Sequence, residues 1–145
     1  MSRSPRNRML LLGALAPLTL TALTAMPADG SSERLEVQQL HAALHPSGDP
    51  DGSGHADFRL NRSRHKVCAD VTWQNIASPD YAHIHKVSDT SIVLDLSSAV
   101  TGGAHCVTGV GGRLIDRLLA HPRRYYFNVH NAEHPAGAIQ GRLHP

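Results

Sequence analysis

Apolar and polar residues alternate along several short stretches of this chain, as they do in half-buried β-strands. The clearest alternation covers four apolar residues separated by polar or small ones: Val67, Ala69, Val71 and Trp73. A second stretch, over 56–60, repeats the pattern with Ala56, Phe58 and Leu60. We predict a strand in each stretch and expect Val71 and Trp73 to lie in the core.

Turn residues separate further short apolar stretches. Strands are predicted over 35–44, where the alternation is weak, and over 92–96, 105–110, 125–130 and 138–143. Four leucine and isoleucine residues at helical spacing predict one short helix over 113–120, ended by Pro122. Many short strands with Gly/Pro-rich turns and one helix predict an all-β fold, an antiparallel Greek-key sandwich or barrel of immunoglobulin-like or superoxide-dismutase-like type.

The amino-terminal region has the three parts of a secretory signal peptide. Arg3, Arg6 and Arg8 precede a run over 9–25 without charge, and small residues continue to Ala28. We predict a signal peptide over 1–28 and a secreted, extracellular protein.

An uncleaved membrane anchor is the alternative interpretation of this segment. The run over 9–25 is short for a membrane span, and Pro17 interrupts it. Cleavage would leave a short polar linker over 29–34, a domain over 35–145 and no membrane contact.

The net charge argues against a nucleic-acid partner. The chain has 14 Lys and Arg residues against 12 Asp and Glu, and three of the arginines lie in the first eight residues. The rest of the chain is close to neutral, so it has no field to attract DNA or RNA. We expect the partner to be another protein or a component of the cell envelope.

Two cysteines, Cys68 and Cys106, lie in the exported part. In an oxidising compartment such a pair usually forms a disulfide, which is our prediction. Free thiols or thiolate metal ligands are the alternatives.

Eleven histidines all follow position 40, and three of them form a candidate site. His83 and His85 project from the same face of a strand, and His130 ends another predicted strand. Imidazoles so placed suit copper or zinc. Alternatively, they hydrogen-bond loop backbone and hold the fold closed; in either case we expect the three to cluster. Most of the other eight we expect to be solvated: His41, His45, His55, His65, His105, His121, His134 and His144.

Two motifs together resemble the CHRD domain, a domain named for repeats in chordin and common in exported bacterial proteins. They are His83-Ile84-His85 and the segment 126–141, which reads YFNVHNAEHPAGAIQG. The resemblance covers about 35–143. It implies a β-sandwich with an immunoglobulin-like barrel and no established catalytic activity.

A fainter likeness is to the copper half of copper–zinc superoxide dismutases. It implies that His83, His85 and His130 match copper-ligand positions. That family's zinc-binding loop has no counterpart over 86–90, so the bridging histidine is missing and dismutase activity is not implied. No Gly-x-Ser-x-Gly sequence points to a hydrolase either. We expect a non-catalytic binding or structural module of the cell exterior, with a copper- or zinc-binding protein as the alternative.

Overall fold

The structure is a computed structural model that describes residues 37–103 and 105–145. The predicted signal peptide, the linker and the first two residues of the predicted domain lie outside the described residues. The strands are β1 (Val37–Pro46), β2 (Ser53–Asn61), β3 (Lys66–Gln74), β4 (Tyr81–Lys86), β5 (Ile92–Asp95), β6 (Cys106–Thr108), β7 (Tyr125–His130) and β8 (Ile139–Arg142). The helices are α2 (Gly112–Ala120) and two short 3₁₀ turns, η1 (Ser97–Ala99) and η2 (Pro122–Arg124).

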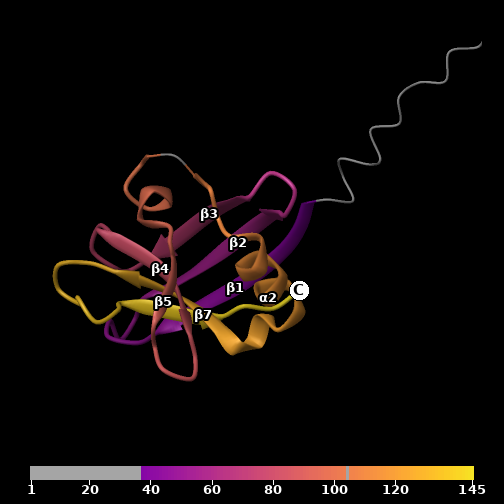
Figure 1. The fold of residues 1–145 in the computed structure, drawn as a ribbon. Helices are drawn as coiled ribbons and strands as arrows, with labels where there is room; N and C mark the ends of the chain where they lie inside the picture. Colours follow the sequence, from indigo (N-terminus) through magenta and orange to yellow (C-terminus); the bar gives the residue numbers. More distant parts are fainter. Residues whose placement is uncertain (1–36, 104) are drawn as a thin grey trace, which may run out of the picture.

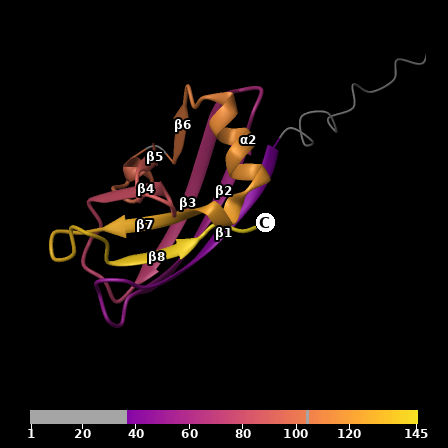
Figure 2. The ribbon, with the colours of Figure 1, turned by 60° about the horizontal axis from the view of Figure 1, so that its bottom comes forward.

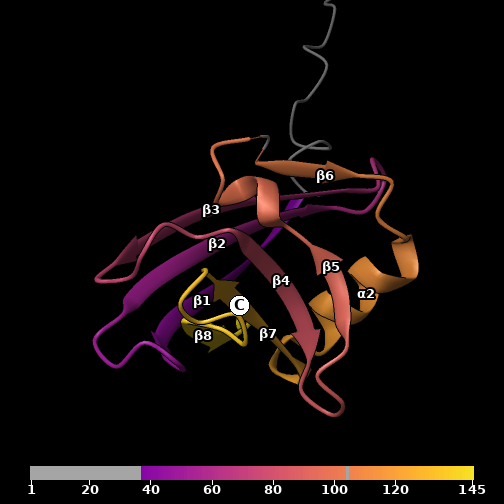
Figure 3. The ribbon, with the colours of Figure 1, turned by 90° about the vertical axis from the view of Figure 1, so that its left-hand side faces the viewer.

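The eight strands form one sheet in the order β5-β4-β7-β8-β1-β2-β3-β6, with every pair antiparallel. Strand β1 joins the two halves: its residues 37–44 pair with β2, and His45 and Pro46 pair with β8. The sheet curls so that β4 and β5 lie across from β2 and β3 (Figures 1 and 3). The all-β class with one short helix is therefore confirmed.

The hydrophobic core lies between the two halves of the curled sheet. Phe58 on β2 meets Phe127 on β7 edge to face, with ring centroids 5.1 Å apart. Along β2 the buried residues Ala56, Phe58 and Leu60 alternate with outward-facing ones, as predicted. Along β7 the residues directed into the core are Tyr125, Phe127 and Val129.

Helix α2 begins after Gly111 and buries Ile115 and Leu118 against the core. It lies beside the turn between β2 and β3 (Figure 2), where Arg62 Nε donates to Asp116 Oδ1 at 2.6 Å. The predicted helix over 113–120 is thus confirmed to within one residue. Within the described ranges, no helix combines the length and apolar character needed to cross a membrane.

The prediction that Val71 and Trp73 lie in the core is wrong in degree. Their strand face is as predicted, because Val67 and Ala69 on the same face are fully buried. Val71 and Trp73 are only partly buried against the core. Strand β6 pairs with no more of β3 than Lys66–Cys68, so the distal half of β3 is a sheet edge with less cover.

The predicted disulfide is confirmed and joins β3 to β6. Cys68 and Cys106 are directly opposite each other, with Cα atoms 3.9 Å apart. The next hydrogen bond, from Ala69 N–H to the His105 carbonyl at 2.7 Å, makes this a non-hydrogen-bonded pair, the closer kind in antiparallel sheets. The bridge attaches the three-residue strand β6 to the sheet.

Candidate metal centre

Strands β4 and β7 place His83, His85 and His130 on one surface, here named the three-histidine cluster. In the β4–β7 register Tyr81 is opposite His130, and His83 is opposite Asn128. Alternate residues, such as Ile84 and Phe127, face the core. The three imidazoles therefore project from the outward face of the sheet, away from the hydrophobic core.

The imidazoles of the three-histidine cluster converge as predicted. His83 Nδ1 lies 3.3 Å from His130 Nε2. The ring centroid of His83 lies 5.1 Å from that of His130 and 5.7 Å from that of His85. Each of the three residues offers a nitrogen within 4.8 Å of the other two. The geometry is thus compatible with one shared ion.

Two turns cover the cluster and fix its rings. The Nδ1–H of His85 donates to the Thr90 carbonyl at 2.8 Å, and that of His130 donates to the Pro135 carbonyl at 3.0 Å. As a result His85 and His130 are 7% and 8% exposed, and the side chain of His83 is 15% exposed. The alternative role, hydrogen bonding to loop backbone, is therefore realised at these two Nδ1 atoms.

The same hydrogen bonds determine which ring nitrogen of His85 and of His130 has a lone pair available for a metal. A carbonyl only accepts, so Nδ1 carries the proton and Nε2 carries the lone pair in neutral His85 and His130. His130 Nε2 can accept from His83 Nδ1, but His85 Nε2 is buried and has no partner among residues 37–103 and 105–145. Buried polar atoms are rarely left unpaired, so this nitrogen calls for an explanation.

Burial also favours the neutral forms of His83 and His130. It lowers the pKa of His83, and positive charge on His130 would lower it further, while Asp95 opposes the shift. Burial likewise lowers the pKa of His130, against the raising effect of the Pro135 carbonyl. Both rings are therefore neutral at pH 7, which is the form that binds metals.

Outer groups surround the three rings. Tyr126 stacks on His85 with centroids 5.0 Å apart, and Tyr81 stacks on His83 at 6.2 Å. Asp95 Oδ1 lies 3.9 Å from His83 Nε2, on the side of the ring opposite Nδ1. In metal-bound histidines, the ring nitrogen that does not bind the metal usually donates to a backbone carbonyl or a carboxylate. The donor set of three imidazoles fits zinc or copper.

The expectation that most of the other eight histidines are solvated is confirmed, because five of them are exposed: His45, His55, His65, His105 and His121. Several of the eight nevertheless make polar contacts. His41 and His55 both contact Asp57, His65 Nδ1 contacts the Val110 carbonyl at 3.0 Å, and His134 lies 3.6 Å from Asp49. The group of His41, His55 and Asp57, here named the histidine–aspartate cluster, was missed. His55 and Asp57 are two residues apart in one strand, so their common face could be predicted from the sequence. His41 joins them only through the β1–β2 register.

Comparison with known families agrees with the resemblance seen in the sequence. The sequence profile of the CHRD domain matches residues 27–143. The chain belongs to the CHRD family. No curated protein and no solved structure matches it. In this CHRD domain both motifs that carried the resemblance contribute to the three-histidine cluster, His83-Ile84-His85 from β4 and His130 from β7.

Proposed function

We propose that this CHRD-domain protein is exported and binds one copper or zinc ion through His83, His85 and His130. The observation that carries the proposal is His85 Nε2, a buried acceptor that lies beside two other imidazoles and has no partner in the described part of the chain. Leaving such an atom unpaired costs about 1–3 kcal/mol. An ion shared by the three rings would remove that cost.

Each ring has a defined way of presenting a lone pair to the ion. His85 and His130 would bind through Nε2, because their Nδ1 atoms are held by the two turns. His83 would bind through Nδ1, so its proton must move to Nε2, on the side of the Asp95 carboxylate. The ion would then supply Lewis acidity and a link between β4, β7 and their covering turns.

The burial of the cluster supports a binding role rather than catalysis. Because His85 and His130 are buried and the side chain of His83 is only 15% exposed, an ion can reach them but a larger organic substrate can contact little of them. The disulfide supports export, because such bridges persist in oxidising compartments.

A second candidate function follows from a basic cavity of about 480 Å³ near the turn after β4. Four cationic residues and no acidic ones are among its lining residues: Lys86, Arg123, Arg124 and Arg142. Such a surface fits an anionic polymer of the cell envelope. Dextran sulfate should bind the wild type, and an Arg123→Glu/Arg124→Glu variant should lose that binding at low salt. Equal binding by both proteins would exclude this function.

The metal proposal is tested on mature secreted protein made without an affinity tag. Metal content is measured by mass spectrometry, and zinc and copper affinity by competition with a chromophoric chelator. His83→Gln/His85→Gln/His130→Gln should lose the tightest-bound ion, whereas the matched control His121→Gln, at an exposed position, should keep it. Tight binding that persists unchanged in the triple variant would overturn the proposal.

A further inference from the structure

We propose that His41, His55 and Asp57 form a second zinc site on the protein surface, separate from the three-histidine cluster. These residues lie on β1 and β2, whereas the three-histidine cluster lies on β4 and β7. The inference therefore does not depend on the proposed function.

The register of the β1–β2 ladder brings the three side chains together. His41 is directly opposite Asp57, and Ala43 is opposite His55. Neighbouring residues such as Ala42 and Ala56 face the core, so the three side chains share the outward face. The small side chain of Ala43 leaves the neighbouring surface open to the His55 ring.

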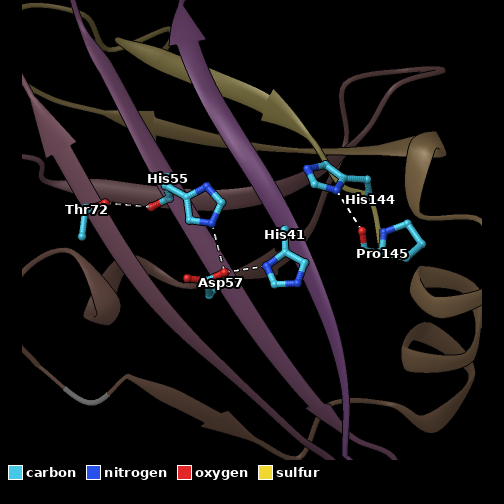
Figure 4. A network of polar contacts seen from close by, with 6 residues as sticks. All are labelled: His41, His55, Asp57, Thr72, His144 and Pro145. Carbon is cyan, nitrogen blue, oxygen red and sulfur yellow. Dashed lines mark hydrogen bonds and ion pairs between the residues drawn. The ribbon is translucent and has the colours of Figure 1, made fainter.

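The three potential ligand atoms lie close together (Figure 4). Asp57 Oδ1 lies 2.5 Å from His41 Nδ1 and 3.0 Å from His55 Nε2. All three atoms lie within 4.8 Å of one another. The imidazoles come from two neighbouring strands and converge on a single carboxylate oxygen between them. Little movement is needed to admit an ion there.

The composition and exposure of this cluster indicate zinc. Two imidazoles and one carboxylate are a common three-residue zinc ligand set that leaves a position for water. The side chains of His41, His55 and Asp57 are 33%, 47% and 51% exposed, so hydrated ions can reach them. In the absence of an ion the two histidines share Asp57 as a hydrogen-bond acceptor, so zinc must displace an interaction that already exists.

The strands hold the cluster in place from both sides. Thr72 Oγ1 donates to the His55 carbonyl at 3.5 Å. On the other side His41 and His144 exchange backbone hydrogen bonds of 2.8 and 2.9 Å, and their rings lie 5.9 Å apart. His144 thus fixes the carboxyl-terminal segment beside His41 (Figure 4). A site with fixed ligand positions loses less entropy on binding an ion.

The test is zinc titration of the wild-type protein followed by NMR of assigned histidine ring resonances. We expect saturable shifts of His41 and His55 with an affinity separate from that of the three-histidine cluster. Asp57→Asn keeps the size and an acceptor oxygen but removes the charge, so it should stay folded and weaken this binding by at least about tenfold. His121→Gln is the control and should leave it unchanged.

Two results would overturn the second site: no shift of the His41 and His55 resonances at millimolar zinc, or equal affinity in Asp57→Asn and wild type. Neither result bears on the three-histidine cluster, because its own resonances report on it in the same titration. Conversely, loss of binding at His83, His85 and His130 alone would leave the second site supported.

Discussion

The two clusters of ligand-type residues occupy equivalent places in the sheet but different surroundings. Both project from the outward face, the three-histidine cluster from β4 and β7 and the histidine–aspartate cluster from β1 and β2. Turns ending near Thr90 and Pro135 cover the first, in which His85 and His130 are buried and the side chain of His83 is 15% exposed. No turn of the described residues covers the second in this way, and a third to a half of each side chain is exposed.

The difference shows that neighbouring turns, rather than strand parity, give the three-histidine cluster its chemistry. There the turn carbonyls accept hydrogen bonds from Nδ1–H of His85 and His130. Among the described residues, His85 Nε2 is left without a partner. In the histidine–aspartate cluster Asp57 already satisfies both imidazoles. An ion therefore gains a vacant partner in the first cluster and competes with an existing one in the second, so we expect tighter binding at the first.

Removal of the disulfide should have the largest effect on the free energy of unfolding. It should leave metal binding in the other half of the sheet almost unchanged. Cys68→Ser/Cys106→Ser opens a loop of 38 positions, so unfolding free energy should fall by about 4 kcal/mol. The bridge belongs to β3 and β6, away from β4 and β7. Urea unfolding should show the loss, while metal affinity of the three-histidine cluster stays within a few-fold of wild type. A large loss of that affinity would contradict the expectation that the bridge does not hold the three-histidine cluster in place.

Metal binding should stabilise the fold through the covered cluster. At a free ion concentration 100 times the dissociation constant, linkage predicts about 2.7 kcal/mol of stabilisation. Thermal unfolding with and without zinc should show it in wild type and in Asp57→Asn. The His83→Gln/His85→Gln/His130→Gln variant should lose it. If Asp57→Asn abolished most of the stabilisation, the stabilising ion would lie at the histidine–aspartate cluster, which would contradict this prediction.

Truncation of Trp73 tests the uncovered edge of the half that carries the histidine–aspartate cluster. Because Trp73 is only partly buried, Trp73→Ala should cost about 1–2 kcal/mol, less than the 3–5 kcal/mol of a fully buried aromatic residue. Phe127→Ala, at a fully buried position, is the matched comparison and should cost more. Equal losses of unfolding free energy in the two variants would contradict the partial burial of Trp73 at the edge of β3.

The smallest effect expected is a pH dependence confined to the covered cluster. Burial lowers the pKa values of His83 and His130 in the fold, so the unfolded chain binds more protons just below pH 6.5. Stability of the metal-free protein should be full above pH 6.5 and fall as the pH drops through the lowered pKa values. Thermal unfolding in EDTA at pH 7.5, 6.5 and 5.5 should show this slope. His83→Gln/His130→Gln should flatten it, and an unchanged slope in that variant would assign it to other groups.

Much of the fold could be predicted from the sequence because alternation reports directly on which face of a strand is buried. The boundaries of β7 and the buried residues of β2 follow from local pattern alone. The partial exposure of Trp73 could not be predicted, because it depends on how far β6 extends along β3. That length is a property of two distant segments rather than of the pattern in either one.

The candidate sites divide in the same way. His83 and His85 are two residues apart in one strand, so their common face was predictable, and a family-like motif supplied His130. His41 lies 16 positions before Asp57, and only the β1–β2 register places them opposite each other. The unpaired nitrogen of His85 likewise depends on the turn that brings the Thr90 carbonyl to Nδ1.

The most direct test of the account is a crystal structure of the zinc- or copper-loaded mature protein with anomalous difference data collected at the edge of that metal. We expect a peak bounded by His83 Nδ1, His85 Nε2 and His130 Nε2. A metal-loaded crystal with no peak at these three nitrogens would contradict it.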